Sequence, residues 1–382
     1  MPSLNDASEA ASAPLNDGSL DETAARQTDV VTAVLNPRQL IRELNAFKDS
    51  RPSRSGWELA VTLVPFLSLF AAMLFAVQAG YFFATVLTPL AGLLLLRLFI
   101  IQHDCGHGSF LPNKSGNDWV GRALGVLTLT PYDCWRRSHA LHHAATGNLD
   151  ARGSGDVDTL TVREFYERTR SQRVLYRFYR HPLVLLGLGP AYLFLLRHRL
   201  PIGLMKSGWL YWVSAMTTNV VTVLILAALI GLFGLFVTAL VFLPVLLMAA
   251  STGVWLFYIQ HQFENAHWDQ SENWSFHDAA LQGSSHLDLP LPLRWFTANI
   301  GVHHVHHLAS RIPFYRLPEV LRAYPRLRDM NRFTALQTLG TLRLALWDEG
   351  QRRLVTFREA SRASIYSAAA PQQYPDNSPT IS

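Results

Sequence analysis

The sequence predicts an all-α integral membrane protein with four transmembrane helices, paired in two hairpins, and a cytoplasmic helical cap. Two observations predict the membrane helices: no Asp, Glu, Lys or Arg occurs from Ala60 to Leu96, and none occurs from Ser207 to Gln260. A third observation predicts the cap, because three histidine-rich clusters lie outside these uncharged runs, in the regions that carry most of the Lys and Arg.

Each uncharged run is long enough for two membrane passes, since one pass needs about 20 apolar residues. We expect the spans at 57–78, 81–101, 208–231 and 234–259. Glycine breaks the helical runs at Gln78-Ala79-Gly80 and at Gly231-Leu232-Phe233-Gly234, so these are the expected turns. A soluble protein would have to bury both runs, although ordinary soluble helices have only about 11–12 residues.

The distribution of Lys and Arg predicts the orientation. Fifteen of them lie from Arg97 to Lys206, and more precede the first run, so both regions are predicted to be cytoplasmic. The histidine clusters and both termini then face the cytoplasm, from a membrane that we expect to be a bacterial inner membrane. The net charge of +5 suits anionic headgroups, and no motif indicates nucleic-acid binding.

The two ends of the chain differ in composition from its centre. Residues 1–35 and 360–382 are polar and poor in large apolar side chains, so they are predicted to be disordered and to flank one membrane domain at 36–359. Cys105 and Cys134 both fall on the cytoplasmic side, where no disulfide is expected.

The three clusters share a spacing that places their histidines on one side of a helix. In helices, positions i, i+3 and i+4 face the same way. Another histidine emerges directly after the second uncharged run, at the same membrane boundary. Nine imidazoles are too many for one ion, so two metal ions are predicted. The candidate ligands are His103, His107, His139, His142, His143, His261, His303, His306 and His307.

The other histidines are not expected to bind metal. His304 lies about 100° around the helix from His303 and would point away, with a role in supporting the site. Five others stand alone in the sequence: His181, His198, His267, His277 and His286. Asp104 either accepts a hydrogen bond from a ligand imidazole or caps a turn.

The donor set indicates the kind of metal chemistry. The chain has no His-Glu-x-x-His motif and no cysteine pair, so it does not resemble a structural zinc site. Neutral nitrogen ligands with few carboxylates suit Fe(II), which can activate O2. A site at the mouth of a membrane bundle indicates a lipid-derived substrate, whose alkyl chain would enter a tunnel between the helices.

The three clusters resemble the histidine boxes of the membrane fatty acid desaturases. His103-Asp104-Cys105-Gly106-His107 is similar to the first box, His139-Ala140-Leu141-His142-His143 to the second, and His303-His304-Val305-His306-His307 to the third. The residues around the second and third boxes resemble bacterial acyl-lipid desaturases of the delta-12 and related types. The resemblance covers approximately residues 57–325.

This resemblance implies a di-iron oxidoreductase that uses O2 and two electrons to place a double bond in a lipid-linked or thioester-linked acyl chain. By position, the eight box histidines would bind iron, and Gln260-His261 resembles the additional ligand region of the family. No flavin, dinucleotide or haem motif is present, so the resemblance implies a separate electron donor, ferredoxin.

Two alternatives stay open. A hydroxylase or ketolase with the same boxes, acting on acyl, alkane or carotenoid substrates, would add oxygen instead of removing hydrogen. A non-redox membrane protein, either a transporter or a zinc hydrolase, would use the histidines differently. Transport predicts ionisable residues that line a path through the spans, and neither uncharged run contains them.

Overall fold

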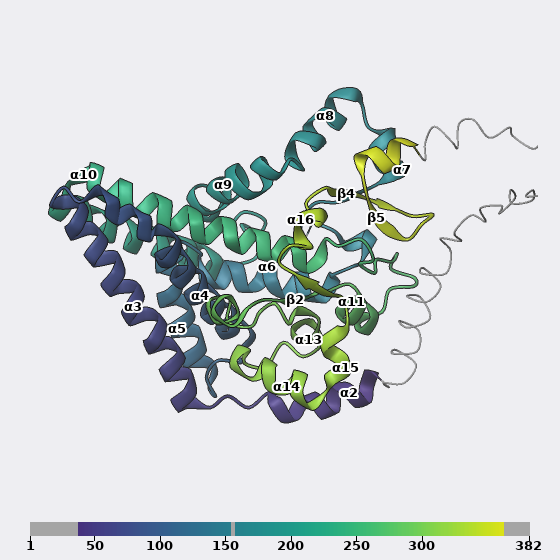
Figure 1. The fold of residues 1–382 in the computed structure, drawn as a ribbon, viewed down its shortest axis with the longest axis horizontal. Coiled ribbons are helices and arrows are strands. Elements are labelled where there is room, and N and C mark those ends of the chain that lie inside the picture. Colours follow the sequence, from purple (N-terminus) through teal and green to yellow (C-terminus); the bar gives the residue numbers. More distant parts are fainter. Residues whose placement is uncertain (1–36, 154–156, 363–382) are drawn as a thin grey trace, which may run out of the picture. The chain divides into compact units, whose positions relative to one another are not determined.

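The computed structural model describes residues 37–153 and 157–362, which are mostly helical (Figure 1). The segment predicted to be disordered at 1–35 and most of the one at 360–382 lie outside these residues. The chain divides into two units after Glu43. In the first unit, the described residues belong to α2 (Pro37–Leu44). The other helices and the strands of the described residues belong to the second unit, which begins at Leu44.

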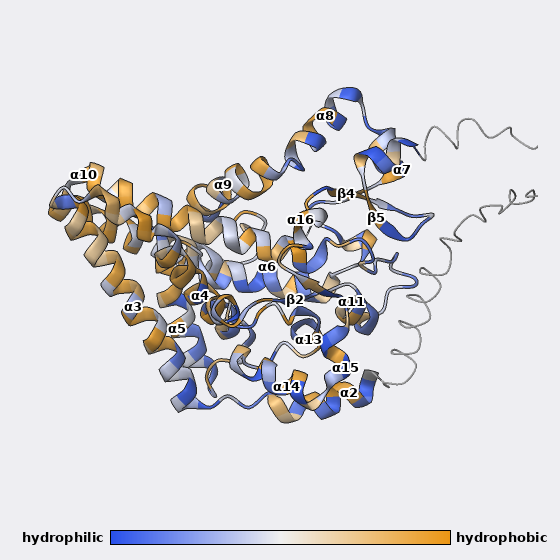
Figure 2. Ribbon diagram, in the orientation of Figure 1, coloured by the Kyte–Doolittle hydropathy of each residue, from blue (hydrophilic) through white to orange (hydrophobic). Residues whose placement is uncertain are grey.

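Three helices are long and apolar enough to cross a membrane, and they make the chain an integral membrane protein (Figure 2). They are α3 (Pro52–Gln78), α4 (Thr88–His107), which a short 3-10 turn from Phe82 precedes, and α10 (Trp209–His261). α3 ends at Gln78 and Gly80 has a φ of 89°, so the first predicted turn is confirmed.

The second predicted hairpin differs from the expectation, because α10 runs through 53 residues. Within α10, Gly234 alone leaves the helical region, with φ 76° and ψ 160°, and helical conformation resumes on both sides of it. The chain direction therefore changes at one glycine, within the predicted turn, and not in a separate loop. The described residues thus contain three long apolar helices where the sequence predicted four.

α4 occupies the centre of the helical core, where it packs against α3, α5 and α10. Leu98 and Ile101 are fully buried there. A Cβ on Gly92 would lie only 2.7 Å from Met248 Cγ, which shows how closely α4 and α10 approach. Their carboxyl-terminal ends carry His103, His107 and His261, so this close packing brings the first and last predicted ligands into one region.

The shorter helices lie between and after these three. They are α5 (Lys114–Leu127), α6 (Tyr132–Ala145), α7 (Val162–Glu167), α8 (Arg170–Tyr179), α9 (Gly189–Leu195), α11 (Phe276–Gln282), α12 (Leu291–Phe296), α13 (His303–Leu308), α14 (Leu317–Ala323), α15 (Pro325–Asp329) and α16 (Thr338–Thr341).

Two small sheets show that the chain is mostly but not entirely helical. β1 (Leu160–Thr161) pairs in parallel with β4 (Leu344–Asp348), which pairs antiparallel with β5 (Arg353–Thr356). β2 (His286–Asp288) pairs in parallel with β3 (Arg332–Thr334) beside α13. The prediction of an all-α chain missed these strands, since runs of two to five residues are too short to show alternation.

A buried ion pair joins α3 to α4. The Arg97 guanidinium donates to the Glu58 carboxylate, to Thr62 Oγ1 at 3.0 Å and to the Trp295 carbonyl, and it lies 4.1 Å from the centre of the Trp295 ring. Glu58 and Arg97 are 3% and 1% exposed. A buried charge that loses its partner is strongly destabilising, so this pair should matter for stability.

Glu58→Gln is expected to lower the free energy of unfolding by about 3–5 kcal/mol, because Arg97 would keep its charge without a counterion. The matched control is Arg54→Gln. Arg54 also pairs with Glu58, but its side chain is 54% exposed, so its loss should cost less than about 1 kcal/mol. Thermal unfolding of the purified protein in detergent checks both, and equal stability of the two variants would contradict the assignment.

Candidate metal centre

The three histidine clusters are helical, as predicted, and they meet at the ends of the long helices. The first forms the last turn of α4, the second lies on α6 and the third on α13. All nine candidate ligands gather in two groups, and in each group the ligand nitrogens lie within 4.8 Å of one another. One group contains His103, His107, His139, His143 and His306, and the other contains His142, His261, His303 and His307.

The first group has the spacing of ligands around one ion. His107 Nε2 lies 3.0 Å from His139 Nε2, His139 Nε2 lies 3.1 Å from His143 Nε2, and His143 Nε2 lies 3.2 Å from His306 Nε2. Nitrogens on adjacent corners of an octahedron with ~2.1 Å bonds are about 3.0 Å apart. One metal ion can therefore contact these imidazoles together.

The second group has the same spacing and one further sign of a ligand. His261 Nε2 lies 3.2 Å from His142 Nε2 and 3.0 Å from His303 Nε2. His307 Nε2 is buried without a hydrogen-bond partner, although buried polar atoms are nearly always satisfied. A metal ion would satisfy this nitrogen, so the residues present fit a second metal.

Burial keeps these imidazoles in the neutral form that binds metals. For five histidines on α6 and α13, burial lowers the pKa well below its ordinary value, and the neighbouring imidazoles lower it further. They are His139, His143, His303, His306 and His307. A histidine must be neutral to bind a metal ion, so these histidines are ready to bind one at neutral pH.

Asp104 accepts a hydrogen bond from a candidate ligand, which is the first of its two predicted roles. Its Oδ1 accepts from His103 Nδ1 at 3.2 Å, and its Oδ2 accepts from the Phe314 amide at 2.7 Å. The bond leaves His103 Nε2 to face the first group. His261 is oriented in a similar way, since its Nδ1 donates to the Gly283 carbonyl at 3.3 Å.

Polar contacts fix α6 against α4 and α5. Arg122 donates to both carboxylate oxygens of Asp133, at 3.0 and 3.2 Å. Tyr132 donates its hydroxyl hydrogen to the Cys105 carbonyl at 2.9 Å, which joins the start of α6 to the first cluster. These contacts determine where His139 on α6 meets His107 on α4.

Trp135 supports the second cluster through an aromatic stack. Its ring lies 4.6 Å from the His139 ring at an interplanar angle of 17°. Gly106 makes room for it, because a Cβ there would lie 2.8 Å from Trp135 Cζ3. The approach of Gly106 to Trp135 could not be predicted from the sequence. Both residues are visible there, as a glycine inside the first cluster and a tryptophan before the second, but their spacing does not show that they touch.

Gly106→Ala should therefore push Trp135 off His139 and lower the turnover number by about tenfold, since small displacements at a site are costly. A double-mutant cycle with Trp135→Leu checks the cause. If the clash is responsible, Gly106→Ala should have little further effect once Trp135 is removed. Additive losses in the double variant would contradict this explanation.

The third cluster is held by backbone and amide contacts. The amides of His303 and His304 both donate to the Ser285 carbonyl, at 3.1 and 3.3 Å. Gln260 donates from Nε2 to the Ile300 carbonyl at 3.2 Å, so the residue before His261 also fixes the chain that enters α13. Gln260 thereby joins the end of α10, which carries His261, to the chain that leads to His303.

The remaining histidines lie outside both groups, as predicted. His304 points away from the site, and its Nε2 donates to the Leu327 carbonyl at 2.8 Å. His267 pairs with Asp269 at 2.9 Å, and His286 donates from Nδ1 to the Arg328 carbonyl at 2.6 Å. Among the described residues, neither His181, His198 nor His277 joins a group of potential ligands.

Arg180 lies outside the histidine clusters in sequence but contacts the end of α10. It is 4% exposed, and its guanidinium donates to Gln262 Oε1 at 2.9 Å and to the Leu344 carbonyl at 2.8 Å. It also donates to the Tyr258 hydroxyl at 3.3 Å. Arg180 therefore attaches the end of α10, on both sides of His261, to β4.

An apolar cavity of about 250 Å³ opens onto both histidine groups. His103 and His139 of the first group and His142 and His303 of the second form part of its wall. The rest is mostly apolar and comes largely from α4, α6, α9, α10 and the segment before α10, with Ile300. It includes Leu95, Leu96, Phe99, Leu193, Phe194, Leu246, Ala249, Gly253 and Phe257. Such a wall suits an alkyl chain.

Comparison with known proteins agrees with this arrangement. The profile of the fatty acid desaturase family matches residues 79–334. A fatty acid desaturase of Bacillus subtilis is 39% identical over 323 residues, which cover 84% of this chain and 91% of that protein. An sn-1 acyl-lipid omega-3 desaturase (ferredoxin) of Synechocystis is 31% identical over 258 residues, 64% of this chain and 68% of that protein. An sn-1 oleoyl-lipid 12-desaturase of Anabaena variabilis is 26% identical over 258 residues, 63% of this chain and 68% of that protein.

Proposed function

The chain belongs to the fatty acid desaturase family, and from this membership we propose that it is a di-iron, O2-dependent desaturase of acyl chains in membrane lipids. The family prediction made from the three histidine boxes is thus confirmed, and with it the assignment as a membrane oxidoreductase. The observation that carries the proposal is the apolar cavity whose wall contains histidines of both groups.

In this proposal the nine predicted histidines are the metal ligands, and each of the two groups binds one metal ion. His103, His107, His139, His143 and His306 would hold one iron ion, and His142, His261, His303 and His307 the other. Iron bound there supplies the redox chemistry that activates O2. Nitrogen donors without carboxylates support iron over magnesium or calcium, which prefer oxygen ligands.

The protein's own contribution is to place one part of an acyl chain beside the histidines. The cavity walls exclude water and hold the chain, so geometry selects the carbons that lose hydrogen. In the overall reaction, a –CH2–CH2– unit, O2, two electrons and two protons give –CH=CH– and two waters. Since the described residues contain no electron-transfer cofactor motif, the two electrons come from a separate donor, which we propose is ferredoxin.

The relatives support the substrate and the donor. The Synechocystis protein is named for acyl-lipid substrates and for ferredoxin, and the Anabaena protein for an oleoyl lipid. We therefore favour an acyl lipid over an acyl thioester as the substrate of this chain. The desaturase domain in this proposal extends over residues 36–359, and the match to the family lies within it.

The membrane topology completes the proposal. We propose that Gly234 divides α10 into two spans, so that α3, α4 and the two halves of α10 cross a bacterial inner membrane four times. The positive-inside bias supports a cytoplasmic position for the histidine boxes and both termini. Cysteine labelling of an introduced residue at Gly234 would test this, since the proposal puts that residue on the periplasmic side.

The function is tested by the fatty acid profile of an aerobic host that expresses the wild type beside His306→Ala, with double bonds located by mass spectrometry. A new acid two hydrogens lighter than its precursor, seen with the wild type alone, is the expected result. Gain of one oxygen would indicate the hydroxylase or ketolase reading instead. Release of free fatty acids without either change would indicate a hydrolase.

A further inference from the structure

A second cavity lies behind the third histidine cluster and is lined by arginines. It has a volume of about 310 Å³, and its wall includes Gly301 and Val302, which immediately precede His303. One carboxylate, that of Asp288, is also present in the wall. The four arginines are Arg294, Arg322, Arg328 and Arg332.

The charges around this cavity are unbalanced. Asp288 pairs with Arg294 at 2.8 Å and with Arg332 at 2.5 Å, which fixes these two guanidinium groups in place. Among the described residues, no carboxylate lies within ion-pair distance of Arg322 or Arg328, and both side chains are exposed. Asp329 also pairs with Arg332, at 3.7 Å, so the four arginines still outnumber the two carboxylates beside them. A surface that is positive over this breadth suits an acidic macromolecule better than a single small anion.

The cavity adjoins the metal centre through a short series of contacts. His286 donates from Nδ1 to the Arg328 carbonyl, and its ring lies 5.8 Å from the His304 ring. His304 follows His303 in α13, and both amides donate to the Ser285 carbonyl. A partner seated on the arginines would therefore be separated from the second histidine group by one layer of packed residues.

This cavity is distinct from the one that suits the acyl chain. The two share no lining residue, and the backbone from Ile300 to Val302 lies between them, since Ile300 lines the acyl cavity while Gly301 and Val302 line the other. The arginine-lined cavity can thus be occupied while substrate is bound.

We propose that the patch formed by Arg294, Arg322, Arg328 and Arg332 docks an acidic one-electron carrier of the ferredoxin class, and that electrons reach the metals through α13. This inference rests on the proposed desaturase function. Each docking event oxidises the carrier's iron–sulfur cluster by one electron. Two such events, with two protons, complete the reduction of one O2 to two waters as the acyl chain loses two hydrogens.

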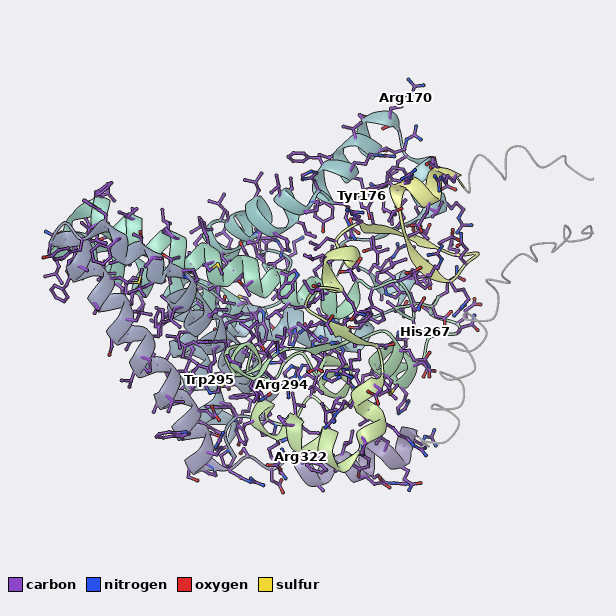
Figure 3. The ribbon with its side chains drawn as sticks, in the orientation of Figure 1. Arg170, Tyr176, His267, Arg294, Trp295 and Arg322 are labelled. Carbon is purple, nitrogen blue, oxygen red and sulfur yellow. The ribbon has the colours of Figure 1, made fainter. Side chains whose placement is uncertain are left out.

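Binding of an acidic two-iron, two-sulfur ferredoxin to the full-length protein in nanodiscs tests the proposal. Arg322→Glu combined with Arg328→Glu reverses the two unpaired charges. The matched control, Arg168→Glu with Arg170→Glu, reverses two exposed arginines at α8; Arg170 and Arg322 lie at opposite sides of the molecule (Figure 3). We expect the dissociation constant at low ionic strength to rise at least about tenfold in the first variant alone, with a weaker salt dependence.

The ratio of ferredoxin-driven to dithionite-driven turnover is the second readout, and it should fall in the Arg322/Arg328 variant and recover in Arg322→Lys with Arg328→Lys. Unchanged ferredoxin binding, or an equal loss in the α8 control, would overturn the proposal. Reduced binding to phosphatidylglycerol vesicles with ferredoxin binding intact would overturn it in favour of a lipid-headgroup site. If dithionite drives no desaturation in the wild type, the proposed function fails, whereas the binding measurement still decides the docking surface.

Discussion

Replacing His306 by alanine is expected to abolish desaturation, with a loss of more than about 100-fold in turnover. Mutation of residues that only support metal ligands already costs about 10–100-fold, so loss of a ligand should cost more. His306 lies within the first group, with its Nε2 3.2 Å from His143 Nε2, and it is 1% exposed. His306 is the only member of the first group that comes from α13, so its removal leaves that side of the group without a nitrogen donor.

His277→Ala is the matched control, because His277 belongs to neither histidine group and is partly exposed on α11. Conversion of a labelled saturated acid by the two variants, measured at equal protein levels in the membrane, gives the comparison. Full activity of His306→Ala would remove this residue from the ligand set. Loss of activity in both variants would instead point to a general effect on folding.

Gly253→Phe is expected to lower turnover of long acyl chains by more than about tenfold while the metals remain bound. Gly253 lines the acyl cavity on α10, two helical turns before His261 and on the same face. A Cβ at this position would meet only Leu96 Cδ1, at 3.5 Å, so a methyl group fits. A phenyl ring would extend into the space that we assign to the substrate.

Gly253→Ala serves as the control and should keep most of the activity. Both variants are to be compared on labelled acids of several lengths, together with the metal content of the purified proteins. The phenyl variant should lose more than about tenfold on long chains and less on short ones, since a filled pocket discriminates by substrate size. Unchanged conversion of long chains by Gly253→Phe would mean that the acyl chain lies elsewhere.

The gathering of the candidate ligands could be predicted from the sequence because it depends on local geometry. Helical spacing places His139, His142 and His143 on one side of their helix whatever the rest of the fold does. His261 was predicted from its position at the end of an uncharged run, and the close packing of α10 on α4 brings it to the site. His304 was set apart by its angle around the helix alone, and it lies in neither group.

The division into two groups could not be predicted, because it depends on how three helices cross. His142 and His143 are adjacent in sequence, yet they enter different groups. The same reason hid the contact between Gly106 and Trp135, the hydrogen bond from the Phe314 amide to Asp104, and the contacts of Arg180 at the end of α10. Each of these contacts joins segments far apart in the chain, and no periodic pattern encodes such pairs.

The fold was predicted well where hydrophobicity alone decides it, and less well elsewhere. The uncharged runs gave the long helices and the turn at Gly80, while the bend in α10 is confined to Gly234. The run from Ala60 to Leu96 has no charged residue, but α3 and α4 extend beyond it and carry Glu58 and Arg97. They form an interhelical ion pair and not a path for ions.

The metal content of the anaerobically purified wild type tests the central claim most directly. Inductively coupled plasma mass spectrometry should find two iron ions per chain, and about one in His307→Ala, which changes only the second group. Mössbauer spectra of the wild type should show that both are bound by nitrogen donors. One metal ion per chain, or two zinc ions in protein that is active, would contradict the assignment of two iron-binding histidine groups.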